Sequence, residues 1–164
     1  MIDADGYRAG VAMIIFNHQR RLFWAKRVGQ NAWQFPQGGM QEGETPEQTM
    51  YRELKEEVGL DPQDVSIVTV THSWLRYDLP EHLIRHHSLP MCIGQKQRWF
   101  LLKFVGDESR INLEDTATPE FDGWAWVNYW HPMKGVINFK RGVYQKVLRI
   151  FSPYLFKNVR MRKK

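Results

Sequence analysis

The sequence predicts a single domain of the α/β or α+β class, in which a sheet packs against helices. Runs typical of strands recur along the chain, and they are interleaved with two segments of helical spacing. The chain has 164 residues, 43% of them hydrophobic, which suits one domain with its own core. No internal repeat or linker divides it. We therefore expect one domain over residues 3–156 and a basic tail over 157–164.

The N-terminal part predicts a hairpin followed by a loop. Residues 11–16 are continuously apolar, 17–20 have turn character, and 22–26 are largely apolar again. A continuous apolar run indicates a well-buried strand. Residues 29–44 contain four glycines and Pro36, so we expect a loop with short extended pieces.

A helix start is well marked at Thr45. Thr45 can cap the helix, Pro46 suits its first position, and Gln48 completes a capping box. The helix is expected to end near Val58, where Gly59 can adopt the left-handed conformation. These signals place a firmly bounded helix directly after the glycine-rich loop.

The second half of the chain predicts three strands and a helix. Residues 66–72 alternate and are β-branched, and 99–105 and 123–127 also have strand character. Residues 78–96, with two prolines and three histidines, predict an irregular excursion. Apolar residues at helical spacing predict a helix over 139–151.

Most aromatic and histidine side chains are interpreted as structural. Trp124 and Trp126 flank Ala125, and we expect them on opposite faces of their strand. The six histidines show no metal-ligand spacing, and His86 and His87 are expected in a solvated loop.

Composition excludes several classes of protein. The single cysteine, Cys92, excludes an intramolecular disulfide framework and a cysteine-based zinc cluster. No apolar run approaches the ~18–20 residues that span a bilayer, so no membrane partner is expected. Residues 1–6 are acidic and lack the order of a signal peptide. These features favour a soluble cytoplasmic protein.

The net charge of +5 is unevenly distributed. The last eight residues hold five basic side chains and no acid, so the rest of the chain is balanced. Within it, Glu42–Asp64 carries a net charge of −6. Such a concentration of like charge is repulsive, and either a bound cation or a solvated helix face would relieve it.

Three carboxylates lie on one stripe of the predicted helix. Glu53, Glu56 and Glu57 are spaced i, i+3 and i+4, within a sector roughly 100° wide. Oxygen ligands of this kind suit a hard divalent cation such as Mg²⁺. Many exposed helices carry the same pattern, so an ordinary solvated face is the alternative.

The surrounding spacing favours the metal site. The segment comprises Gly38, five residues, Glu44, seven residues and then Arg-Glu-Leu-Lys-Glu-Glu-Val-Gly-Leu over 52–60. This arrangement resembles the Nudix box, with all nine constrained positions filled over 23 residues. The resemblance implies a Nudix hydrolase with an α/β/α sandwich, a mixed sheet flanked by helices, in which the box forms loop–helix–loop.

The same resemblance implies the roles of the box residues. It implies a divalent metal, Mg²⁺ with Mn²⁺ or another cation as alternatives, bound by Glu53, Glu56 and Glu57 and by the carbonyl of Gly38. The catalytic residues are then Glu53, Arg52 and Glu57. We expect Glu53 to be the general base and Arg52 to orient it. An i,i+4 surface pair between Arg52 and Glu56 is the alternative.

A further carboxylate is expected to join the site from another loop. Glu120 lies in a Pro-Glu-Phe-Asp-Gly turn, and the matching family position is a metal ligand. It could complete the coordination of a second metal or accept the proton of water. Simple turn chemistry with Asp122 is the alternative.

Segments outside the box resemble the family members that act on RNA 5′ ends. The likeness covers roughly residues 3–151 and departs at Ala9-Gly10 and in the short basic tail. It is carried by residues 5–8, 33–39, 74–77, 93–100, 119–124 and 139–141. The partner it implies is the 5′ end of RNA, with no DNA partner expected. Hydrolysis would leave a 5′-monophosphate and expose transcripts to decay.

Six residues outside the box are expected to contact substrate: Arg8, Arg27, Tyr77, Gln95, Phe139 and Lys140. The three cations suit phosphates, and the phenylalanine ring suits stacking on a terminal base. Tyr77 and Gln95 lie in segments that look too polar for a core strand and could reach phosphate or base edges. For each residue, an ordinary surface or core position is the alternative.

Two other functions remain open. A dinucleoside polyphosphate such as diadenosine tetraphosphate also presents a base beside a polyphosphate. A non-catalytic module that binds RNA ends or nucleotides is the third hypothesis, but an incomplete box would be needed to favour it.

Overall fold

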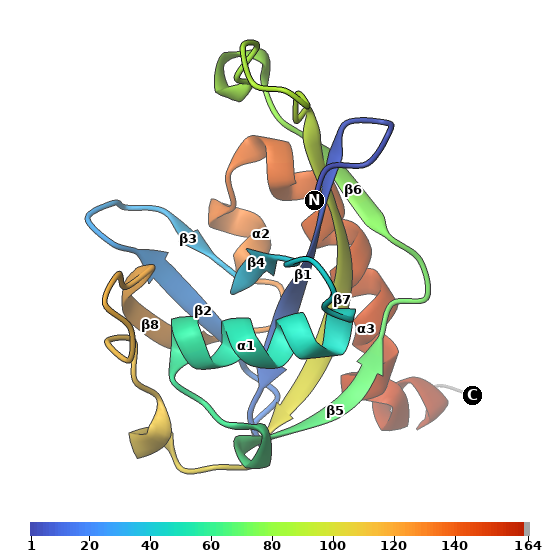
Figure 1. The fold of residues 1–164 in the computed structure, drawn as a ribbon. Coiled ribbons are helices and arrows are strands. Elements are labelled where there is room, and N and C mark those ends of the chain that lie inside the picture. Colours follow the sequence, from blue (N-terminus) through green and yellow to red (C-terminus); the bar gives the residue numbers. More distant parts are fainter. Residues whose placement is uncertain (163–164) are drawn as a thin grey trace.

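The computed structural model describes the backbone of residues 1–162 and the side chains of residues 1–156. Within this part, a mixed sheet is flanked by helices (Figure 1). The strands are β1 (Tyr7–Phe16), β2 (Leu22–Arg27), β3 (Trp33–Gln34), β4 (Gln37–Gly39), β5 (Val65–Val70), β6 (Leu75–Asp78), β7 (Gly94–Phe104) and β8 (Phe121–Val127). The helices are α1 (Pro46–Val58), α2 (Pro132–Gly135) and α3 (Arg141–Arg162). No membrane-spanning helix is found among these residues.

The centre of the sheet is a long parallel pair. The strands run in the order β3-β2-β1-β7-β5, and β1 and β7 are parallel from Tyr7↔Gly94 to Phe16↔Lys103. All other pairs are antiparallel: β4 adds to β1, β6 to β7 and β8 to β2. The sheet is therefore mixed, as expected.

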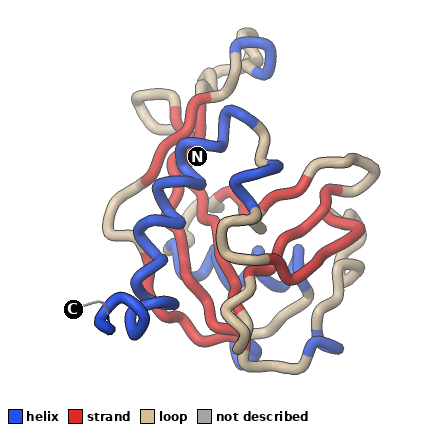
Figure 2. Tube along the Cα trace, turned by 180° about the vertical axis from the view of Figure 1, so that it is seen from behind, coloured by secondary structure: helices blue, strands red, loops and turns tan. Residues whose placement is uncertain are grey.

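Helices cover both faces of this sheet, which explains the apolar run in β1. Val11 and Met13 face the side that packs against α1, whereas Ala12 and Ile14 face the side that packs against α3. Seen from behind, α3 runs along the strands on the face opposite α1 (Figure 2). A strand buried on both faces cannot alternate between polar and apolar residues.

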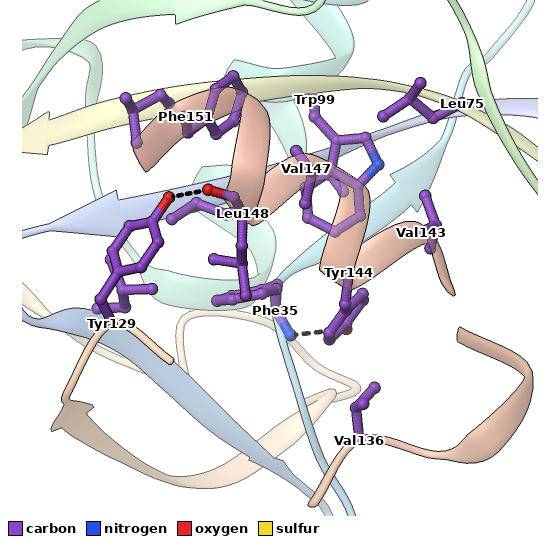
Figure 3. Packing of buried hydrophobic residues seen from close by; sticks show 14 of the residues in the cluster. Phe35, Leu75, Trp99, Tyr129, Val136, Val143, Tyr144, Val147, Leu148 and Phe151 are labelled. Atoms are coloured by element: carbon purple, nitrogen blue, oxygen red, sulfur yellow. Dashed lines mark hydrogen bonds between the residues drawn. The ribbon is translucent and has the colours of Figure 1, made fainter. Parts of the chain in front are cut away.

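The core under α3 is aromatic and includes two internal hydrogen bonds. Trp99 and Tyr144 are fully buried, with ring centroids 5.5 Å apart. Tyr144 accepts a hydrogen bond from the backbone N–H of Phe35 at 3.1 Å, and Tyr129 donates to the carbonyl of Leu148 at 2.6 Å (Figure 3). These bonds satisfy buried polar groups and fix α3 against the sheet.

Several sequence-based boundaries were wrong. The expected excursion over 78–96 is shorter, because β6 precedes it and β7 already begins at Gly94. Trp124 and Trp126 do not lie on opposite faces: residues two apart on a strand share a face, and both rings pack near Phe23, at 5.4 and 6.1 Å.

The C-terminal helix also differs from expectation. Phe139 belongs to a 3-10 turn, η4 (Asn138–Lys140). Helix α3 runs from Arg141 to Arg162 instead of ending near residue 151, with a kink at Phe156, whose backbone is not helical. The side chains of the basic tail, and Lys163 and Lys164 altogether, lie outside the described residues.

Candidate active site

Helix α1 is bounded at both ends as the sequence predicts. Thr45 and Gln48 form a complete capping box. The backbone N–H of Gln48 donates to the Thr45 hydroxyl at 3.2 Å, and the backbone N–H of Thr45 donates to the Gln48 side-chain oxygen at 2.9 Å. Gly59 ends the helix at φ 77°, and a Cβ there would lie 2.4 Å from the carbonyl oxygen of Asn112. Fixed ends give the carboxylates of α1 a defined place beside the sheet.

The three glutamates of α1 differ sharply in exposure. The side chain of Glu56 is 50% exposed, that of Glu53 is 12% exposed, and Glu57 is buried. Burial raises the pKa of Glu53 and raises that of Glu57 well above its usual range, and neighbouring carboxylates, including Glu120, add to both shifts. Crowded, desolvated carboxylates of this kind are stabilised by a cation.

Arg52 joins the box into one hydrogen-bonded unit. Its Nε and Nη2 bind both oxygens of Glu44, at 2.7 and 2.9 Å, and Nη2 also donates to the carbonyl of Gly39. Its Nη1 donates to Glu53 at 2.8 Å and to Glu56 at 3.4 Å. The i,i+4 contact with Glu56 therefore exists, but it is the longest of five bonds.

Strand β4 packs closely against the carboxylates of α1. A Cβ on Gly38 would lie 2.0 Å from Cδ of Glu53, so only glycine fits. The neighbouring N–H of Gln37 donates to Oε2 of Glu57 at 3.1 Å. On the other side, a Cβ on Gly10 would lie 2.6 Å from the carbonyl oxygen of Gly38. The two glycines together allow β1, β4 and α1 to approach closely.

The donor chemistry fits a hard divalent cation. Glu53, Glu56, Glu57 and the Gly38 carbonyl offer oxygen ligands only, and Gly38 packs so closely against the Glu53 carboxylate that no Cβ fits between them. No three His, Cys, Asp or Glu side chains of the described residues are already arranged as a metal-binding group. Glu53 and Glu56 instead bind Arg52.

A second group of side chains faces the glutamates. Glu120 lies in the loop before β8. The N–H of Val28, the residue that follows β2, donates a hydrogen bond to the Glu120 carbonyl and so holds this loop beside the end of β2. The side chains of Glu120 and Arg27 are about half exposed, and the carboxylate and guanidinium lie 3.8 Å apart. The buried Nε of Arg27 has no partner among the described residues. Arg27 therefore retains capacity to bind an anion.

Lys140 is the buried cation of the site. Its ammonium donates to the side-chain oxygen of Gln34 at 3.3 Å. Burial, and then repulsion from Arg27, lower the pKa of Lys140 to about 8, while Glu120 and Glu57 act in the opposite direction. Arg27 has a long, 3.8 Å contact with the Glu120 carboxylate and Lys140 binds a neutral amide, so the two cations retain capacity for a negatively charged ligand.

The remaining expected contacts fall into two places. Phe139 and Tyr77 pack together, with centroids 5.8 Å apart, next to Lys140. Tyr77 is buried in strand β6, so its segment is not too polar for a core strand, and its hydroxyl accepts from Gln37 at 3.4 Å. Arg8 and Gln95 are paired across β1 and β7 and line a separate pocket of about 310 Å³.

Sequence reasoning missed a buried amide pair beside the site. Gln97 is 1% exposed, and its Nε2 donates to Oε1 of Gln37 at 3.2 Å. Gln37 is thereby linked both to Gln97 and to Tyr77, while its backbone holds Glu57. The only signal in the sequence was Gln37 beside two glycines; Gln97 stands between a lysine and an arginine, and nothing local distinguishes it.

The fold and the carboxylate helix define a hydrolase of the Nudix class. The family model for the NUDIX domain matches residues 6–147, and the chain belongs to this family. The chain is 58% identical over 156 residues to RNA pyrophosphohydrolase of Histophilus somni (strain 2336), covering 95% of this chain and 81% of that protein. It is 57% identical to RNA pyrophosphohydrolase of Hydrogenovibrio crunogenus, covering 96% of this chain and 95% of that protein.

Solved structures confirm the fold at lower identity. Dihydroneopterin triphosphate pyrophosphohydrolase of E. coli superposes with a TM-score of 0.64 at 21% identity, over 87% of this chain and 97% of that one. An Ap4A hydrolase of C. elegans superposes with a TM-score of 0.63 at 18% identity, over 90% and 97% of the two chains. The expected mixed sheet flanked by helices is therefore confirmed.

Proposed function

We propose that this protein is a metal-dependent hydrolase of RNA 5′ ends that converts a 5′-triphosphate or 5′-diphosphate to a 5′-monophosphate. The observation that carries the proposal is the complete carboxylate helix beside two cations: Arg27, whose buried Nε has no hydrogen-bond partner among the described residues, and the buried Lys140. Relatives at 57–58% identity that carry the name RNA pyrophosphohydrolase support the choice of substrate. The proposed setting is the cytoplasm, where the product would enter 5′-end-dependent decay.

The metal would be held by residues from two elements. Glu53, Glu56 and Glu57 of α1, the carbonyl of Gly38 and Glu120 would be its ligands, with Mg²⁺ as the expected ion and Mn²⁺ as an alternative. When bound, the ion supplies charge neutralisation for the phosphates and makes water more acidic.

The chain's own groups would then divide the remaining work. Glu53 accepts a proton from the attacking water, and Arg52 holds the Glu53 carboxylate in place. Water attacks phosphorus, the phosphoanhydride P–O bond breaks, and pyrophosphate or phosphate leaves.

Substrate binding would use the cations and the aromatic ring beside the carboxylates, together with the separate pocket that Arg8 and Gln95 line. Arg27, Lys140 and Arg8 bind phosphate oxygens, with arginine offering bidentate geometry. Phe139 stacks on a terminal base, a contact worth about 1–3 kcal/mol. Tyr77 and Gln95 contact phosphate or base edges, which for the buried Tyr77 requires its hydroxyl to turn from Gln37.

The test is Mg²⁺-dependent release of phosphate and pyrophosphate from a short 5′-triphosphorylated RNA, beside diadenosine tetraphosphate at equal concentration. Faster conversion of RNA to a 5′-monophosphate supports the proposal. Preference for the dinucleotide would keep the metal site but change the substrate. No turnover of either would favour a binding module.

A further inference from the structure

A groove of about 470 Å³ lies directly beyond the proposed base-stacking residue. Its lining comes from β6, which is an edge strand of the sheet, and from the first turns of α3, each with a residue shortly before it. Its walls include Trp74, Arg76 and Tyr77 on one side and Phe139, Gly142 and Lys146 on the other. Tyr77 and Phe139 belong also to the site described above, so the groove continues that site outward.

The groove combines an aromatic ring with cations. The indole of Trp74 is half-buried, with the Lys96 ammonium 5.2 Å and the Arg98 guanidinium 5.9 Å from its ring centroid. Lys146 is exposed on the opposite wall, and no acidic side chain of the described residues lies within ion-pair distance of it. No acidic residue is part of the groove lining.

Two of the nearby cations are partly neutralised. The guanidinium of Arg76 lies 3.6 Å from Asp5, and the ammonium of Lys96 lies 2.9 Å from Asp3. Among the lining residues, the unpaired charge is therefore carried by Lys146. Arg98 lies beside Trp74 but outside the lining, and its Nε donates to the carbonyl of Thr71 at 2.6 Å. The half-buried indole of Trp74 and the exposed ammonium of Lys146 line the same groove, and together they present a stacking surface for a base and charge for its phosphate.

We propose that this groove binds single-stranded RNA downstream of the 5′ end, with Trp74 stacking on a base and Lys146 contacting the backbone. The inference rests on the proposed function and extends it, because a substrate base on Phe139 leaves the rest of the strand at the mouth of the groove. Stacking on an aromatic ring tolerates any base. We therefore expect the groove to increase the affinity for longer RNA without adding a preference for particular bases.

The test compares two substrates in one double variant, Trp74→Ala/Lys146→Ala. The substrates are a 5′-triphosphorylated dinucleotide and a 5′-triphosphorylated ten-nucleotide RNA without secondary structure. We expect KM for the ten-nucleotide RNA to rise about 5- to 50-fold, with kcat unchanged and the dinucleotide unaffected. The matched control is Trp130→Ala/Lys103→Ala, which removes one exposed tryptophan and one exposed lysine outside the groove.

A binding measurement separates this inference from the proposed function. Fluorescence anisotropy of a labelled ten-nucleotide RNA with a 5′-hydroxyl requires no hydrolysis. A loss of affinity in the groove variant but not in the control supports the groove, even if the native protein hydrolyses neither RNA and the proposed function fails. Equal KM and equal affinity in native protein and groove variant, or an equal rise in KM for both substrates, would overturn the inference.

Discussion

The carboxylate of Glu53 is confined by its neighbours: Gly38 leaves no room behind it, and Arg52 donates to it at 2.8 Å. Glu53→Gln preserves this shape and removes the charge. We expect turnover of triphosphorylated RNA to fall by about 10²–10⁴-fold, because the variant lacks the proposed base and metal ligand. Steady-state hydrolysis at saturating Mg²⁺ measures the effect.

Glu47→Gln is the matched control, since Glu47 lies exposed in the first turn of the same helix. It should retain native turnover, and both variants should keep the native circular dichroism spectrum. Native activity in Glu53→Gln would remove Glu53 from the proposed role.

The two adjacent glycines of β4 offer a steric test. A Cβ on Gly38 would lie 2.0 Å from Glu53, whereas the nearest atom to a Cβ on Gly39 is Cδ of Arg8 at 3.9 Å. We expect Gly38→Ala to lower the free energy of unfolding by about 1–3 kcal/mol and to impair turnover. Gly39→Ala should change stability by less than about 1 kcal/mol. Urea unfolding compares them; equal stability of the two variants would contradict the close approach.

Lys140 gives a pH-dependent prediction. Its folded pKa of about 8 is below its ordinary value of 10.5, mainly because of burial. The unfolded chain therefore binds more protons between these values, and stability rises with pH across that window. Below about pH 8 the penalty for the buried ammonium is fully present, at most about 3 kcal/mol.

The variant Lys140→Met removes this penalty. We expect it to be more stable than the native protein at pH 7, and the difference to shrink as pH rises from about 8 to 10.5. Urea unfolding at pH 7, 8.5 and 10 measures the difference. A gap that stays constant with pH would show that the ammonium is not destabilised by burial.

Among the elements, α1 depends on its N-terminal cap. Thr45→Ala removes the side-chain acceptor of the capping box and should cost about 1 kcal/mol. For a domain of this size, that lowers Tm by about 2–4 °C. Thr45→Ser keeps the hydroxyl and should retain native Tm in calorimetry. Reduced stability in both variants would attribute the effect to the threonine methyl group instead.

Elements with local signals were predicted well, including most of the apolar strands, whereas the short strand β6 and the polar start of β7 were not. The bounds of α1 follow from Thr45, Pro46 and Gly59, all of which act within one turn. Strand β6 has no such signal, because its four residues become a strand only through pairing with β7. Gln95 and Lys96 have the polarity of a loop, yet parallel pairing with β1 carries the strand through them.

The contacts of the site also differ in how far the sequence predicted them. The box resemblance implied that Arg52 orients Glu53, and the two side chains are in contact; the two hydrogen bonds from Arg52 to Glu44 were not predicted. The pairing of Gln37 with Gln97 depends on how β4 and β7 are placed around β1, and no local pattern encodes it. The assigned metal ligands and substrate contacts stay predictions.

At the scale of the whole molecule, the two faces of the sheet position different groups of the site. The face under α1 places the carboxylates, whereas the face under α3 builds the aromatic core that supports Lys140 and Phe139. The glycine-rich strand β4 brings the two sides together at one end of the sheet. Negative and positive groups thus meet there, although they come from opposite layers.

The net positive charge is expected to add a long-range electrostatic attraction for RNA. We propose that residues 3–156 form the catalytic domain and that the basic tail over 157–164 adds sequence-independent affinity for RNA. Its five basic residues account for the whole net charge of +5. Each cation that binds a phosphate of single-stranded RNA steepens the dependence of log affinity on log salt concentration by about 0.7.

Replacing all five basic tail residues by glutamine should therefore raise KM for a ten-nucleotide RNA at low salt and flatten the salt dependence of kcat/KM, while kcat stays native. The slope should fall by about 0.7 for each phosphate that the tail no longer neutralises, up to about 3.5 in all. Lys103→Gln, an exposed cation on β7, serves as the control for a simple change in net charge. Unchanged slopes in the tail variant would restrict RNA binding to the folded domain, because counterion release by the tail could not then contribute.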